Sequence, residues 1–271
     1  MSLGQVESPN RPARGSRHCF PDGFAEEDLP VTGHHCPTLT PMTIDDRVWT
    51  PARHPLARLL RDLAAGHFRE ADGGWTRVSP WSQQHQAIIT LTGHAVLAVS
   101  YDVTDEQLAD LRIDGLGGAH HPRVVSALAG ANGWIDLLKI LMLGVGTGGD
   151  AHQSLVSRPE LATHPLVGHV RRTSQNVQVL GSRDPREQDV VVVSNGVAGL
   201  RQVSVAVAPE HLGRRRSARV IDQALSCVPE HELVVACVPP GNAAALRAAL
   251  SAGFVPIGSV QLFSSRPEHS A

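Results

Sequence analysis

Several features are scarce or missing in this chain of 271 residues, and each absence excludes a class of protein. No run of about 18 uninterrupted apolar residues occurs, so the sequence predicts no membrane-spanning helix. The opening segment MSLGQVESPN is polar and lacks the apolar core of a secretory signal, which predicts a cytoplasmic protein. The formal net charge is only -2, and both nucleic acids and anionic membranes need a concentrated basic surface. Neither is therefore an expected partner.

Cysteine and lysine are also scarce. The four cysteines contain no C-x-x-C pair, so neither a disulfide framework nor a zinc ribbon is indicated. The segments His18-Cys19 and His34-His35-Cys36 offer nitrogen and sulfur ligands, but adjacent ligands suit zinc poorly, and we expect no metal site. Lys139 is the only lysine among the basic residues, and this composition by itself indicates no function.

Apolar residues make up 42% of the chain, enough to form the core of one large domain or two small ones. Residues 1–45 are rich in proline, glycine, serine, histidine and charge, and we expect them to form a flexible arm. The remainder is interpreted as an N-terminal α/β part (46–160), a second domain (161–264) and a short tail (265–271).

Local patterns predict helices and strands that first pair locally and then alternate, which indicates an α/β protein with a mixed sheet and helices on its faces. Gly93 separates two β-rich runs in a predicted hairpin, and Thr104 is the predicted N-cap of a short helix. The segment 134–143 fits either a strand or a helix. The other expected elements are helices at 54–68, 102–111, 124–128, 163–173, 214–226 and 241–252, and strands at 86–92, 94–100, 176–180, 189–194, 200–207, 233–238 and 254–263.

The segment around residue 209 has the pattern of an anion site. A strand ends at Val207 and leads through Pro209 into a turn that opens a helix, so unpaired backbone N–H groups converge with the positive end of the helix dipole. Gly213 lets the backbone approach a phosphate, and the Ser217 hydroxyl is a further donor. The three arginines 214–216 raise the local positive potential, although an arginine triplet is also typical of a solvated helix face.

Two segments in this half resemble the GNAT acyltransferases (GCN5-related N-acetyltransferases). The first, VSVAVAPEHLGRRRS, lies where that family has V-x-V-x-P-E followed by a glycine-rich loop. The second matches N-x-x-A-x-x-L/A and a later G-F through Asn242, Ala245, Leu246, Gly253 and Phe254. The similarity covers residues 165–264. The preceding residues resemble the family only loosely, as a diverged GNAT-like half would in two-part actinobacterial members.

The resemblance implies a GNAT fold that uses acetyl-CoA as co-substrate and a small-molecule amine as acceptor. The strand segment Val205-Ala206-Val207 would splay from its neighbour and bind the pantetheine arm as an added strand would. The pyrophosphate would lie in the turn that begins the helix. Asn242 would hold the arm, act as a helix N-cap, or do both. The residues implied in the pyrophosphate turn are Leu212, Gly213, Arg214, Arg215, Arg216 and Ser217.

The chain departs from the family pattern both in the pyrophosphate loop and at the two positions that commonly hold proton-transfer residues. Leu212, Arg215 and Ser217 replace the usual Arg/Gln, Gly and Gly/Ala of the loop. Gln202 stands where a carboxylate commonly takes a proton from the amine, and Ala249 stands where a tyrosine commonly protonates the leaving thiolate. No catalytic residue is therefore assigned from the sequence.

Histidines are the candidates to replace those groups. His120 and His121 lie in a Gly/His loop and suit proton transfer, or they form an ordinary pair of turn histidines. The weaker candidates are His94, His211 and Glu210, of which Glu210 is expected to support the helix N-terminus, and the only tyrosine, Tyr101, is distant in sequence.

Two functional hypotheses follow. The first is an acyl-CoA-dependent N-acyltransferase acting on the amine of a small molecule, with assembly as a homodimer left open. The second is a GNAT-fold protein that has lost or repurposed transfer, and serves as a ligand-binding module or as an enzyme of specialised metabolism. Fold-level likeness does not separate them, because function resides in the site.

Overall fold

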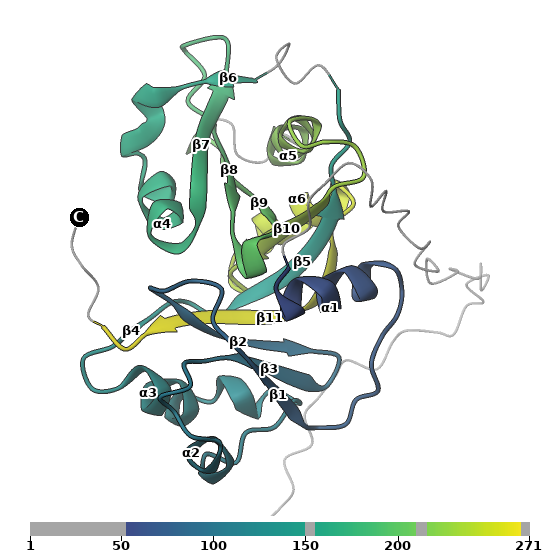
Figure 1. Ribbon diagram of the computed structural model, residues 1–271. Coiled ribbons are helices and arrows are strands. Elements are labelled where there is room, and N and C mark those ends of the chain that lie inside the picture. Colours follow the sequence, from purple (N-terminus) through teal and green to yellow (C-terminus); the bar gives the residue numbers. More distant parts are fainter. Residues whose placement is uncertain (1–52, 150–154, 210–215, 267–271) are drawn as a thin grey trace, which may run out of the picture. The chain divides into compact units, whose positions relative to one another are not determined.

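The computed structural model describes residues 53–149, 155–209 and 216–266, which all belong to one of the two compact units of the chain (Figure 1). The predicted arm, its histidine and cysteine pairs, and residues 267–271 of the predicted tail lie outside these ranges. The strands of the described part form one 11-stranded mixed sheet in the order β1-β3-β2-β11-β5-β10-β9-β8-β7-β6, with β4 paired to β11.

The bounds of the elements agree closely with the sequence patterns. The strands are β1 Trp75–Val78, β2 Gln86–Leu91, β3 His94–Ala98, β4 Trp134–Ile135, β5 Lys139–Val145, β6 Leu155–Ser157, β7 Gln175–Ser182, β8 Val190–Asn195, β9 Arg201–Ala206, β10 Leu233–Val238 and β11 Val255–Ser264. The helices are α1 Pro55–Ala64, α2 Asp105–Asp110, α3 Pro122–Ala129, α4 Pro165–Thr173, α5 Arg216–Ser226 and α6 Ala243–Ser251.

Short-range signals explain several of these elements. Thr104 caps α2, as predicted, and it also forms a capping box with Gln107. Thr92 and Gly93 both have positive φ in the two-residue turn between β2 and β3, the conformation that a tight hairpin needs. The ambiguous segment 134–143 is a strand, divided between β4 and β5. The short strands β1 and β6 were not predicted.

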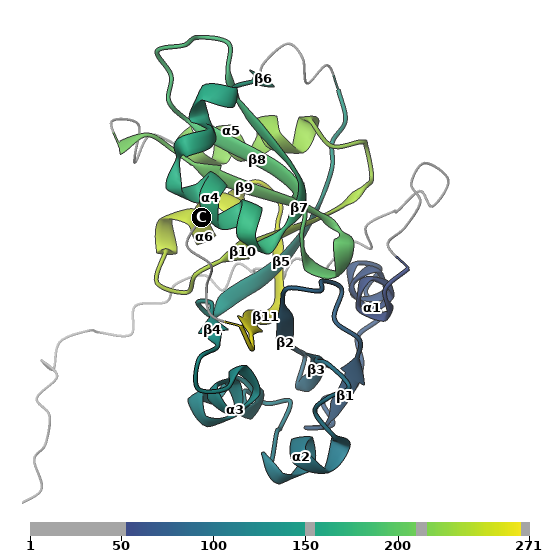
Figure 2. The same cartoon turned by 60° about the vertical axis from the view of Figure 1, so that its left-hand side comes forward.

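One strand of the predicted N-terminal part (46–160) lies between two strands of the predicted second domain (161–264). β5 is antiparallel to β10 on one edge and to β11 on the other (Figures 1 and 2). β11 in turn pairs with β2 through six residue pairs from Gly258 to Phe263. The boundary expected near residue 160 therefore does not interrupt the sheet, and the mixed α/β class predicted from the sequence is confirmed.

Helices cover both faces of the sheet. α1 and α4 pack on one face, where alternate residues such as Leu143 of β5 and Val192 of β8 are buried. α2, α3, α5 and α6 pack on the other face, and α4 and α5 lie on opposite sides of β8 (Figure 2). Among the described helices, none is long and apolar enough to cross a bilayer.

Candidate functional site

The two central strands of the second half separate along their length. β9 and β10 are parallel and pair only at Arg201↔Val234 and Gln202↔Val235, although β9 continues to Ala206 and β10 to Val238. On its other edge, β10 pairs with β5 through six residue pairs. The splay that the sequence resemblance implied at this strand is thus confirmed, and it opens the sheet between its two faces.

A cleft of about 530 Å³ occupies the opening. Its walls are the diverging segments 202–207 and 236–239, together with residues of α4 from one face and of α5 and α6 from the other. The linker between β4 and β5 contributes Asp136 and Leu137. Helices from both faces of the sheet therefore line one and the same cleft.

Five of the cofactor-binding residues predicted from the sequence line this cleft: Val205, Ala206, Val207, Ser217 and Asn242. The Asn242 side chain accepts a hydrogen bond of 3.0 Å from the Ala245 backbone N–H and caps α6, so the predicted N-cap role is confirmed. Leu212, Gly213, Arg214 and Arg215, with the candidates Glu210 and His211, lie outside the described residues.

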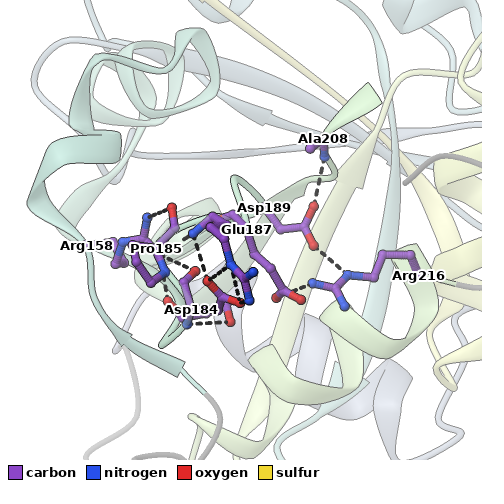
Figure 3. A network of polar contacts seen from close by, with 9 residues as sticks. Arg158, Asp184, Pro185, Glu187, Asp189, Ala208 and Arg216 are labelled. Atoms are coloured by element: carbon purple, nitrogen blue, oxygen red, sulfur yellow. Dashed lines mark hydrogen bonds and ion pairs between the residues drawn. The ribbon is translucent and has the colours of Figure 1, made fainter. Parts of the chain in front are cut away.

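Arg216 is held by two carboxylates at the start of α5 (Figure 3). Its Nε donates to Asp189 Oδ2 at 2.6 Å, and its Nη2 donates to Glu187 Oε2. Asp189 is almost fully buried, and its Oδ1 accepts a 2.9 Å hydrogen bond from the Ala208 backbone N–H. This group, the Arg216 clamp, joins the residue before β8 to the end of β9 and the start of α5. It fixes the approach to the turn in which a pyrophosphate is predicted.

The clamp changes the electrostatic properties of its members. The hydrogen bond from Arg216 holds the pKa of the Glu187 carboxyl below its usual range, and the Asp189 and Glu187 carboxylates raise the pKa of Arg216. Two sides of the guanidinium are therefore already engaged. A direct contact between Arg216 and a diphosphate stays a prediction.

A second charged group lies in the cleft wall and was not predicted from the sequence. Lys139 Nζ donates to Asp136 Oδ2 at 2.6 Å, and Nζ lies 2.8 Å from His169 Nε2. His169 Nε2 is 3.8 Å from Asp136 Oδ2. Asp136 and Lys139 flank the beginning of β5, and His169 comes from α4 on the same face. The only signal in the sequence was that Lys139 is the single lysine.

The side chains of this Asp136–Lys139–His169 cluster are largely buried. The exposed fractions of the three side chains are 6%, 14% and 30% respectively. A buried charge is costly unless it is paired, so the carboxylate and the ammonium stabilise one another in this position. All three residues line the cleft.

Three other cleft residues are unsuited to proton transfer. Burial raises the pKa of the Cys237 thiol to about 12, so it stays protonated near neutral pH and is a poor nucleophile. Gln202 and Ala249, the positions where the family pattern has a carboxylate and a tyrosine, both line the cleft, and neither side chain is an acid or a base.

Three of the histidines considered as replacements, and the tyrosine, lie elsewhere in the described structure. His120 shares a 2.9 Å hydrogen bond with the Ser259 hydroxyl, and burial lowers its pKa. His121 caps α3, and His94 bonds to Asp72. Tyr101 is 69% exposed and stacks with Arg77. None of the four is among the described residues that line the cleft.

Comparisons with known proteins give partial likenesses. No protein-family model matches the chain, and neither does any curated protein sequence. A crystal structure from Novosphingobium aromaticivorans, described as an acetyltransferase from the GNAT family, is 22% identical, covers 49% of this chain and 68% of its own, and has a TM-score of 0.38. A GNAT-family acetyltransferase from Colwellia psychrerythraea is 12% identical, with 48% and 57% covered and a TM-score of 0.30, so the match spans under two thirds of that protein.

Proposed function

We propose that this protein is an acyl-CoA-dependent N-acyltransferase that transfers an acetyl group from acetyl-CoA to the amine of a small molecule. The observation that carries the proposal is the separation of β9 and β10 after two residue pairs, which leaves a cleft through the sheet. Both sequence segments that resemble the GNAT family contribute described residues to the walls of this cleft: residues 203–207 and Ser217 from the first, and Asn242, Ala245 and Phe254 from the second.

The parted strands suit the pantetheine arm of coenzyme A. Backbone groups of β9 beyond Gln202 have no ladder partner on β10, and the amides of the arm would bond to them as an added strand does. Backbone N–H groups at the same edge would stabilise the oxyanion that forms when an amine attacks the thioester. The N-terminal end of α5 would attract the diphosphate.

The cleft also separates the two substrates. α5 and α6 lie on the side assigned to the coenzyme, where Ser217 and Asn242 are. The amine would approach from the α4 side, where Leu137 is 67% exposed beside the opening. Cytoplasmic location and homodimer assembly remain parts of the proposal.

The alternative is a protein of the same fold that binds acyl-CoA without transferring the acyl group. Gln202 and Ala249 favour it, because the cleft lacks the two usual proton-transfer groups at those positions. Steady release of CoA thiol with any amine would exclude it.

Calorimetry with acetyl-CoA tests the binding site. Ala245 of α6 lines the cleft and is partly buried, so Ala245→Trp should fill the opening and lower the affinity by more than about tenfold. Ala243→Trp is the matched control, because Ala243 is exposed on the same helix outside the cleft. Absence of any heat of binding in the unmodified protein, or equal binding by both variants, would refute the proposed site.

A further inference from the structure

Lys139 occupies an unusual position for a lysine. An ammonium group has three N–H bonds, and two of them are assigned by the short contacts to Asp136 Oδ2 at 2.6 Å and to His169 Nε2 at 2.8 Å. Both acceptors belong to the cleft wall, as Lys139 itself does. Within the described structure, the Lys139 ammonium group makes hydrogen bonds to these two acceptors only. The tetrahedral geometry of the ammonium group therefore leaves its third N–H bond without an acceptor in the described structure.

We propose that Lys139 is the proton-transfer residue of this site and that Asp136 and His169 are the positioning residues that orient its ammonium group. The inference rests on the proposed acyl transfer and adds the group that performs its proton chemistry. It explains how a cleft with glutamine at 202 and alanine at 249 would still complete the reaction.

The proton balance closes with a single lysine. The neutral amine attacks the thioester carbonyl, forming the N–C bond. As the tetrahedral intermediate collapses, the C–S bond breaks, and Lys139 gives its third proton to the departing thiolate. The lone pair that is left on Nζ takes the surplus proton from the new amide nitrogen. The products are the amide and CoA thiol, and Lys139 returns to its ammonium form.

The two positioning residues have distinct tasks. The buried Asp136 carboxylate accepts one N–H bond from Nζ at 2.6 Å and is the partner charge that a buried ammonium group needs. His169 Nε2 accepts a second N–H bond, which requires the neutral imidazole with its proton on Nδ1. The neighbouring Cys237 thiol stays protonated and adds no charge. By accepting two of the three N–H bonds, Asp136 and His169 together fix the direction of the third N–H bond of Lys139.

A spectroscopic test uses the fact that the chain has one lysine. Protein grown with lysine labelled with ¹⁵N at Nζ gives a single side-chain signal, which reports only on Lys139. Addition of acetyl-CoA should shift this signal, and desulfo-CoA, which lacks the sulfur, should shift it less. A signal that acetyl-CoA leaves unmoved, although calorimetry shows binding, would overturn the inference while the proposed binding site stands.

A kinetic test separates proton transfer from charge. Lys139→Arg keeps the positive charge, but a guanidinium does not release its proton, so CoA thiol release should fall about 100-fold while the affinity for acetyl-CoA stays unchanged. Release is measured with benzylamine and with water as acceptors. Arg171→Met is the control, because Arg171 is exposed on α4 and lies outside the cleft lining. A Lys139→Arg protein as fast as the unmodified one would overturn the assignment.

Variants of His169 test the positioning role. The glutamine oxygen of His169→Gln can still accept an N–H bond from Lys139, so this variant should retain most of the rate that His169→Ala loses. A His169→Gln protein as slow as Lys139→Arg would place the proton step on the imidazole and overturn the assignment to Lys139. If the unmodified protein does not bind acetyl-CoA at all, the proposed function itself is refuted. If the unmodified protein binds acetyl-CoA but releases no CoA thiol with either acceptor, the result counts against both the proposed acyl transfer and the assignment of its proton transfer to Lys139.

Discussion

The two edges of β10 differ although they belong to one strand. Toward β5, every residue from Leu233 to Val238 has a partner across an antiparallel ladder. Toward β9, only Val234 and Val235 have partners. Backbone N–H and C=O groups that a ladder leaves unpaired need water or a ligand. The contrast shows that the edge toward β5 is fully paired within the fold, whereas much of the edge toward β9 is left without a strand partner.

The largest expected effect on stability comes from the edge of β10 that pairs with β5, here called the closed edge; the edge toward β9 is called the open edge. Leu143 of β5 is fully buried opposite Val235, so Leu143→Ala should lower the free energy of unfolding by about 3 kcal/mol. Val205→Ala on the open edge should cost less than about 1 kcal/mol, because Val205 is only partly buried. Urea denaturation measures both. We expect the opposite order for acetyl-CoA affinity, and equal stability losses would break the comparison.

The Arg216 clamp should follow in size, because it fixes the end of β9 on the open side. Arg216→Ala removes the ion pairs of Arg216 with the buried Asp189 and with Glu187, and we expect a loss of about 2 kcal/mol, reduced by the partial exposure of Arg216 and Glu187. Arg219→Ala, an exposed position on the same helix, is the control and should change stability little. If both variants unfold at the same urea concentration as the unmodified protein, the clamp is not a stabilising element.

Gly144 offers a smaller test on the closed edge. A Cβ at this residue of β5 would lie 2.9 Å from Cε1 of the buried Phe254 ring, so Gly144→Ala should destabilise the protein by about 1 kcal/mol. Phe254 also lines the cleft, and a displaced ring should lower acetyl-CoA affinity. A variant with unchanged thermal unfolding and unchanged binding would show that the closed edge tolerates added volume.

The smallest effect concerns pH. Because Arg216 depresses the pKa of Glu187 in the folded state, the carboxylate contributes stability above its unfolded pKa of about 4.3, and this contribution is lost as pH falls through the lower folded pKa. Glu187→Gln should therefore be less stable than the unmodified protein at pH 7, by less than about 1 kcal/mol. The difference should vanish toward pH 3. A difference that grows on acidification would contradict this sign.

The sequence predicted the features that local patterns control. β-branched runs marked β8 and β10, Thr104 marked the start of α2, and Asn242 marked the start of α6. The opening beside Val205 was inferred from a family resemblance, and the register of β9 and β10 confirms it. The division of the chain near residue 160 stays a prediction.

The features that sequence reasoning missed depend on contacts between distant segments. His169 and Lys139 are separated by 30 positions, and only the packing of α4 beside the start of β5 brings them together. The contacts of Arg216 with Glu187 and Asp189 were not predicted, because these two carboxylates lie just before β8 and far from Arg216 in sequence. A contact between Arg216 and a phosphate stays a prediction. The insertion of β5 leaves no local pattern, because a strand buried on both edges looks the same in sequence whichever strands flank it.

The placement of β5 between β10 and β11 has a consequence for biosynthesis. During translation, β5 emerges from the ribosome well before β10 and β11, the two strands with which it pairs. Both edges of this apolar strand therefore stay unpaired until the last quarter of the chain has been synthesised. Such late pairing between remote segments makes folding slow. We therefore expect nascent chains stalled before β10 to need chaperone protection against aggregation through this strand.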